Sequence, residues 1–163
     1  HGVRKLCFEM HPGFVVYNVE SLLKLRQAVG EVVGANVDPS HLFWQGADVV
    51  SVVRALGNEG AIFHVHAKDT AIDPLNTAIN GLLDPKPLSN VVSRSWLFRT
   101  IGYGHAEIDW RQILSALRQV GYDDVLSIEH EDALMSPSEG LRKAVKVLKE
   151  VMLAEQPGEV FWS

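Results

Sequence analysis

Four side chains able to bind a metal ion each stand at the C-terminal end of a short apolar run that is typical of a β-strand. They are Glu9, Asp38, His66 and Glu129. Successive side chains of a strand point to opposite faces. In each run, the face that holds one of these residues becomes polar near the C-terminal end, while the opposite face is apolar. Ionised carboxylates are unfavourable on an inward face unless something pairs with them. Three carboxylates and one imidazole suit a divalent ion, so the pattern predicts a site for Mn²⁺, Mg²⁺, Co²⁺ or Zn²⁺.

The runs that must position these residues alternate with helical patterns along the chain. Predicted strands cover residues 5–10, 34–38, 61–67 and 125–130. Predicted helices cover residues 19–29, 47–56, 110–120 and 137–153. Three of the helices have plausible N-caps, which are Asn18, Asp109 and Ser136. Strands separated by helices are typical of a parallel sheet with crossover connections, so the predicted fold class is α/β.

The number of βα units bounds the architecture. Four units are half of a closed (β/α)8 barrel, which usually needs about 250 residues. Residues 1–163 are therefore expected to form a single domain or a fragment, with an open doubly wound sheet as the alternative. That alternative lacks a nucleotide-binding loop, because no strand leads into Gly102-Tyr103-Gly104. Residues 69–105 are predicted to be a long inserted βα loop that covers a site, since they include Trp96 and Phe98.

Composition excludes several classes of function. The chain has 163 residues, 47% of them hydrophobic. Its formal net charge of −5 gives no sign of a basic surface that would bind nucleic acid or an anionic membrane. No apolar stretch approaches a membrane span, and no signal-peptide pattern opens the chain. The single cysteine, Cys7, allows no internal disulfide and fits a cytoplasmic location, and it is expected to be a buried, inert thiol. Phe161 and Trp162 are expected to pack against the domain.

Several short motifs resemble those of the xylose isomerase-like sugar isomerase and epimerase superfamily. They are Asp38-Pro39-Ser40-His41, His64-Val65-His66-Ala67-Lys68-Asp69, Gly102-Tyr103-Gly104-His105 and Ile128-Glu129-His130. The resemblance corresponds to the last four strands of that barrel, so it implies the C-terminal half of a TIM barrel. It implies the same four metal ligands, with His66 favoured over His64 and Mn²⁺ as the first choice of metal. It also implies that Glu9 and Glu129 are the catalytic bases on opposite sides of the substrate.

Six further residues are candidates for contacting a small sugar substrate. They are His41, His11, Lys68, Trp44, Arg99 and His105. His41 matches the substrate-contacting histidine of the family motif, and His11 shares the parity of Glu9 if the strand continues. For Lys68 an ion pair inside the barrel is favoured over a substrate contact. Trp44 is as plausible in the core as against a sugar ring.

The leading function implied is a divalent-metal-dependent sugar or keto-sugar isomerase or epimerase that removes a proton next to a carbonyl. A lyase, dehydratase or deglycosylating enzyme of the superfamily needs the same first step. A phosphodiesterase resembling endonuclease IV is disfavoured, because Arg99 stands at the position of a family metal histidine. A non-catalytic half-barrel is the third class. Two open sheet edges predict either a homo-oligomer or a part of a longer chain.

Overall fold

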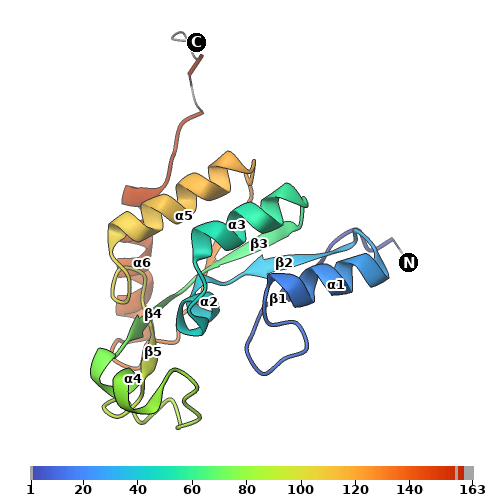
Figure 1. Cartoon of the computed structure of the whole chain (residues 1–163). Helices are drawn as coiled ribbons and strands as arrows, with labels where there is room; N and C mark the ends of the chain where they lie inside the picture. Colours follow the sequence, from blue (N-terminus) through green and yellow to red (C-terminus); the bar gives the residue numbers. More distant parts are fainter. Residues whose placement is uncertain (1, 157, 160–163) are drawn as a thin grey trace.

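Four parallel strands form the sheet that organises the molecule. The computed structural model describes residues 2–156, 158 and 159, and in Figure 1 the sheet runs through the middle of these residues. Its order is β1 (Leu6–Glu9), β2 (Val33–Val37), β3 (Ile62–Ala67) and β6 (Leu126–Ile128). All three neighbouring pairs are parallel, as the alternation of strands and helices predicts. The parallel α/β sheet expected from the sequence is therefore confirmed.

Five helices accompany this sheet. They are α1 (Val19–Val29), α2 (Pro39–Gln45), α3 (Val49–Asn58), α5 (Glu107–Gln119) and α6 (Pro137–Val151). Buried side chains of β2 and β3, such as Val37 and Val65, join the same core as Leu22 of α1 and Leu56 of α3. The apolar faces of the strands thus pack against helices, and the polar faces are left to point the other way.

Three helices differ in their bounds from the sequence-based expectation, and one of the five was not predicted. The α3 helix covers Val49–Asn58 where residues 47–56 were expected, and α6 ends at Val151 where residue 153 was expected. The α5 helix begins at Glu107, so Asp109 lies inside its first turn and is not the N-cap. Its carboxylate instead accepts a hydrogen bond from the backbone N–H of Ala106. The short helix α2 was not predicted, because its seven residues show no long periodic pattern, although Asp38 and Pro39 are ordinary N-cap and first-turn residues.

A folded arm replaces the long loop predicted for residues 69–105. Here the arm means residues 69–99, which contain β4 (Asp69–Ile72), α4 (Pro74–Asn80) and β5 (Trp96–Arg99). The strands β4 and β5 pair antiparallel, with Asp69 opposite Arg99 and Ile72 opposite Trp96. Each strand has only four residues, and the segment between them is rich in Pro and Asn. The local sequence pattern therefore does not predict that the two strands pair. The arm lies at the lower left of Figure 1, below α2 and α6.

The first strand is an edge of the sheet, and its side chains are exposed. Leu6, Cys7 and Phe8 are all exposed, because β1 pairs only with β2 among the described residues. The expectation of a buried Cys7 is therefore wrong for this structure. None of the helices in the described part of the chain is both long and apolar enough to cross a membrane. Phe161 and Trp162 lie outside the described residues.

Candidate metal centre

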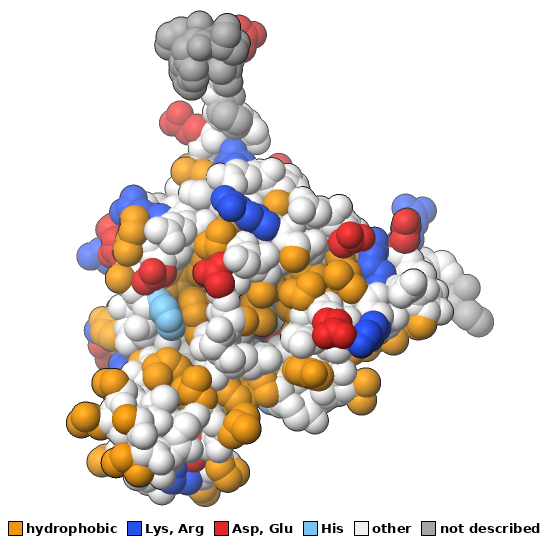
Figure 2. Space-filling model, in the orientation of Figure 1, with side chains coloured by type: hydrophobic (Ala, Val, Ile, Leu, Met, Phe, Trp, Pro, Cys, Tyr) orange, Lys and Arg blue, Asp and Glu red, His pale blue; other side chains and the backbone are white. Residues whose placement is uncertain are grey.

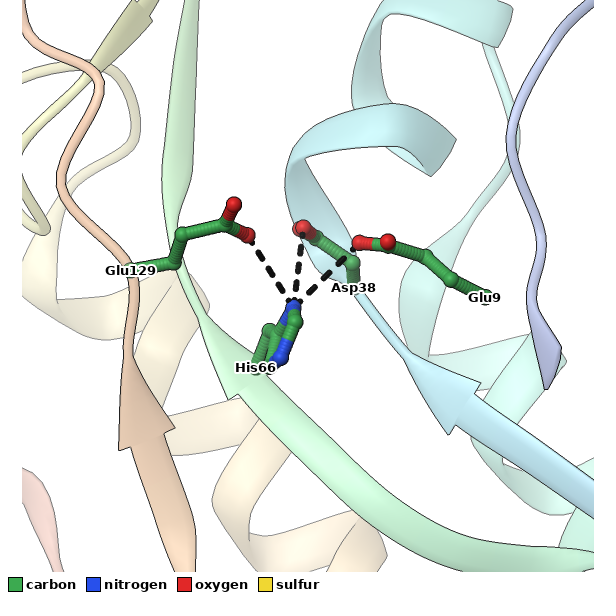
Figure 3. Close-up of side chains that lie close together, drawn as sticks. All are labelled: Glu9, Asp38, His66 and Glu129. Carbon is green, nitrogen blue, oxygen red and sulfur yellow. Dashed lines mark hydrogen bonds and ion pairs between the residues drawn. The ribbon is translucent and has the colours of Figure 1, made fainter. Parts of the chain in front are cut away.

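The four predicted ligands converge at the C-terminal edge of the sheet. Glu9 ends β1, Asp38 directly follows β2, His66 lies near the end of β3, and Glu129 directly follows β6. Each residue offers one ligand atom, and all four atoms lie within 4.8 Å of one another. Figure 3 shows the three carboxylates pointing at one nitrogen of the imidazole. Parallel strands bring their carboxyl ends to one edge, which is why residues so distant in sequence meet here.

The imidazole of His66 lies at the centre of this group. Its Nδ1 atom is 3.1 Å from Glu129 Oε2, 3.3 Å from Glu9 Oε1 and 3.6 Å from Asp38 Oδ2. The carboxylates of Asp38 and Glu9 raise the pKa of His66 to about 10, against the opposing effect of burial. Three carboxylates around one ring thus favour a positive charge at this point.

Asp38 supplies the clearest sign that a cation fits. Its Oδ1 atom accepts a hydrogen bond of 2.8 Å from the backbone N–H of Ser40 and so caps α2. Its Oδ2 atom is buried and has no hydrogen-bond partner among the described residues. A buried, unpartnered carboxylate oxygen is unfavourable, and it points into a group of two further carboxylates and an imidazole. This donor set fits a divalent ion.

Lys68 lies beside the four residues and carries the other positive charge. Its Nζ atom is 2.8 Å from Glu131 Oε2, 3.1 Å from Glu129 Oε2 and 3.5 Å from Asp38 Oδ2. Burial alone would lower the pKa of Lys68, but these carboxylates more than reverse that effect and raise it. Because the side chain is only 2% exposed, the structure places Lys68 in the ion pair favoured by the sequence.

His41 and His11 extend the group along one side. His41 Nε2 is 3.4 Å from Glu9 Oε1, and His41 is the main cause of the strongly lowered pKa of Glu9. The ring of His11 lies 4.2 Å from the ring of His41, and its other neighbour is the exposed Phe14 at 4.6 Å. The structure therefore places His41 in contact with Glu9 and His11 beside His41, and contact of either histidine with a substrate stays a prediction.

The remaining three candidates have their main contacts elsewhere. Trp44 is 8% exposed and stacks on Trp96 at 4.6 Å, as expected for a core tryptophan. Arg99 Nε pairs with Asp132 at 3.1 Å. His105 Nδ1 lies 2.9 Å from Asp69, and the ring stacks on Phe43 at 3.6 Å. No interaction in the structure joins these three side chains to the four ligands, so their contact with a substrate stays a prediction.

Two residues at the site were missed in the sequence. Asn36 Nδ2 lies 3.1 Å from Nε2 of His66, and Glu131 shares Lys68 with Glu129. Each stands two positions from a ligand in the sequence, so strand parity could have identified both. Partners of this kind commonly fix the orientation of metal ligands.

Comparison with known proteins now decides the family. The family model described as "Xylose isomerase-like TIM barrel" matches residues 1–151. The chain belongs to the xylose isomerase-like TIM barrel family. It is 42% identical over 151 residues to the uncharacterized protein YfiH of Bacillus subtilis (strain 168), covering 93% of this chain and 48% of that protein. The chain thus spans about half the length of the curated relative that it matches.

A solved structure agrees with this fold. The crystal structure of a xylose isomerase domain protein from Planctomyces limnophilus superimposes with a TM-score of 0.61 and covers 90% of this chain. This chain covers 44% of that protein, and the sequence identity is 20%, so the likeness bears on the fold alone. Membership of the xylose isomerase-like family is therefore established by the sequence matches, and the half-barrel architecture by the structural one.

Proposed function

We propose that this chain carries the metal-binding and proton-transfer residues of a sugar or keto-sugar isomerase or epimerase. The observation that supports this most directly is the convergence of Glu9 and Glu129 on one point with Asp38 and His66. These two glutamates come from the two edge strands of the sheet, β1 and β6, so they approach that point from opposite directions. A reaction that moves a proton from one face of a carbon to the other needs two bases placed in this way.

The four ligands would hold a divalent ion, for which we favour Mn²⁺. When bound there, the ion would polarise a substrate carbonyl and favour the enediolate form of the sugar. The Oδ2 atom of Asp38 supports this assignment, since it is buried with no hydrogen-bond partner among the described residues and a bound ion would give it a ligand bond. The alternatives Mg²⁺, Co²⁺ and Zn²⁺ accept the same donor set.

The proton steps fall to the two glutamates. One carboxylate takes a proton from the carbon next to the carbonyl, and the other glutamic acid returns a proton to the opposite face. Each glutamate is oriented by a positively charged or hydrogen-bonding neighbour, Glu129 by Lys68 at 3.1 Å and Glu9 by His41 at 3.4 Å. A glutamate is ionised at neutral pH even with its ordinary pKa, and the contact with His41 lowers the pKa of Glu9 further. An ionised carboxylate is the form needed to remove a proton.

A lyase of the same family remains the second candidate. It shares the removal of a proton next to a carbonyl and differs only in that the enediolate then expels a neighbouring group. Phosphodiester hydrolysis fits the donors less well, because the group found among the described residues contains a single histidine. The histidine-rich centre that such hydrolysis uses would need more imidazole ligands.

Exchange of substrate hydrogen for solvent deuterium tests the proposal. The chain is incubated with Mn²⁺ and a panel of keto-sugars in D₂O, and NMR follows loss of the signal from the C–H next to the carbonyl. Wild type is expected to exchange at least one sugar, and E9Q and E129Q each to lose about 10²- to 10⁴-fold in rate. Appearance of a β-elimination product would identify the lyase.

Glu20→Gln is the matched control. Glu20 is also paired with a lysine, Lys24 at 2.6 Å, but it lies exposed on α1 and is not one of the four ligands, so E20Q is expected to retain the exchange. Calorimetric titration of Mn²⁺ is run on each variant, since E9Q and E129Q should also bind the metal more weakly. Exchange that survives in E9Q and E129Q, or metal binding that neither substitution weakens, would contradict the proposal.

A further inference from the structure

Glu129 lies just beyond the last paired residue of its strand. The β6 strand has three residues, and its pairing with β3 ends where Ile128 lies opposite Ala67. Glu129 is the next residue and begins a loop, residues 129–136, that runs to α6. The sheet therefore fixes the backbone before Glu129 but not after it, so the position of Glu129 also depends on how this loop is fastened.

Asp132 fastens this loop to the base of the arm. Its side chain is inaccessible to solvent, and its carboxylate pairs with Arg99 Nε at 3.1 Å. It also accepts hydrogen bonds from the backbone N–H groups of Thr100, at 2.8 Å, and Leu134, at 2.9 Å. Burial alone would raise the pKa of Asp132, but these hydrogen bonds and Arg99 lower it overall. A buried carboxylate with partners at both oxygens holds the loop in one conformation.

The base of the arm also carries the lysine that pairs with Glu129. In the antiparallel pair of β4 and β5, Arg99 lies opposite Asp69, and Asp69 directly follows Lys68 in the sequence. Lys68 Nζ lies 3.1 Å from Glu129 Oε2. The contact between Arg99 and Asp132 therefore joins the strand pair next to Lys68 to the loop that begins with Glu129.

We propose that Asp132 is a positioning residue for Glu129. The inference rests on the proposed function, in which Glu129 is both a metal ligand and a base. Asp132 is not one of the four converging ligands and acts through the loop. On the other side of the loop, the ring of His130 packs so closely on α6 that a Cβ on Gly140 would overlap it. The loop is thus fixed between the arm and α6, and loss of the Asp132 contacts would release one of the two sides.

Asp84 makes the same set of contacts elsewhere in the arm and provides a matched control. Its side chain is also inaccessible to solvent and pairs with Lys86 Nζ at 2.8 Å. It accepts hydrogen bonds from the backbone N–H groups of Ser95, at 2.7 Å, and Lys86, at 3.1 Å. Asp84 and Asp132 thus each bind one cation, one distant N–H and the N–H two residues on. Asp84 belongs to the segment between β4 and β5, which Figure 2 shows as a lobe at the lower left.

Calorimetric titration of Mn²⁺ tests the positioning role without relying on turnover. D132N places an amide NH₂ against one of the backbone N–H groups that the carboxylate binds, and it removes the negative charge beside Arg99. Its Kd for Mn²⁺ is expected to rise about tenfold, the smaller effect typical of residues that support metal ligands. D84N makes the same change in the arm and is expected to leave this Kd unchanged. If D132N does not fold, R99Q replaces it, because it leaves both backbone hydrogen bonds of Asp132 in place, and K86Q becomes the control.

Deuterium exchange of a keto-sugar separates positioning from a general loss of structure. In D132N the kcat for exchange is expected to fall about 100-fold, since a misplacement of about 1 Å can cost that much, while KM changes little. A Kd for Mn²⁺ and a kcat that are the same in D132N and D84N would overturn the inference, and the proposed function would still stand if E129Q had lost exchange. If wild type exchanges no keto-sugar, the proposed function fails and the Mn²⁺ titrations alone decide the role of Asp132.

Discussion

Asp38 uses its two carboxylate oxygens for different purposes. One oxygen caps α2 through the backbone N–H of Ser40, and the other lies buried among the candidate ligands. Asparagine caps a helix about as well as aspartate but is a poorer ligand for a divalent ion. The D38N variant should therefore fold like wild type and bind Mn²⁺ at least about 100-fold more weakly, since even the partners of ligands can change affinity by that factor. Isothermal titration with Mn²⁺ measures the change.

Asp48 provides the control for this substitution. It caps α3 through the backbone N–H of Ser51 at 2.7 Å and is not one of the four candidate ligands. D48N makes the same chemical change at the same kind of position, so its affinity for Mn²⁺ should match that of wild type. Equal affinities in D38N and D48N would show that Asp38 is not a ligand.

At the scale of single residues, strand parity places the four candidate ligands on one face of the sheet, while the family resemblance selects His66 over His64. Parity works because every second side chain of a strand shares a face, whatever the rest of the fold does. It could not identify the contacts of Trp44 or Arg99, because these depend on Trp96 and Asp132, which lie on other elements. The role of Lys68 was judged correctly for a physical reason, since a buried ammonium needs carboxylates around it.

At the scale of elements, one buried carboxylate fastens the turn at residues 100–105 to the sheet. Asp69 Oδ2 accepts hydrogen bonds from the backbone N–H groups of Gly102, Gly104 and His105, at 2.9 to 3.1 Å. The same carboxylate pairs with the ring of His105 through Oδ1. A Cβ on Gly104 would lie 2.4 Å from the carbonyl oxygen of Thr70, so only glycine fits this approach. The turn that leads into α5 is thus fixed by the first residue of β4.

This contact makes part of the stability depend on pH. The Asp69 carboxylate, against the effect of burial, raises the pKa of His105 above its usual value near 6.5. The folded state then binds more protons than the unfolded state, so this contribution is complete below about pH 6.5 and is lost as pH rises through the folded-state pKa. In urea unfolding, the free energy of unfolding of wild type should exceed that of H105Q at low pH. This difference should shrink as pH rises through that range. If the free energies of unfolding of wild type and H105Q changed with pH in the same way, the stabilising contact between Asp69 and His105 would be contradicted.

The elements that the sequence predicted well are those with long periodic patterns. The helix α1 has the bounds expected, because its apolar spacing, the Asn18 cap and Gly30 all agree. The arm was missed, since β4 and β5 are short and lie far apart in the sequence. The strand β5 is also held by tertiary contacts such as the stacking of Trp96 on Trp44, at 4.6 Å, which no local pattern reveals.

At the scale of the whole molecule, the sheet is open on the side of β1. Leu6 and Phe8 are exposed there, and the chain covers only about half the length of YfiH and of the Planctomyces limnophilus protein. The four candidate ligands nonetheless all come from this half. Metal binding and the convergence of the two glutamates can therefore be studied on this chain.

A metal ion bound by these ligands would connect strands that share no hydrogen bond. Glu9 ends β1 and Glu129 follows β6, and these strands are the two edges of the sheet. Bound metal should therefore slow hydrogen exchange of backbone amides in β1 and β6 together. At a free Mn²⁺ concentration of 100 times Kd, the free energy of unfolding should rise by about 2.7 kcal/mol. Exchange measured by mass spectrometry should show neither effect in D38N, and protection confined to one edge strand would mean that Glu9 and Glu129 do not share the ion.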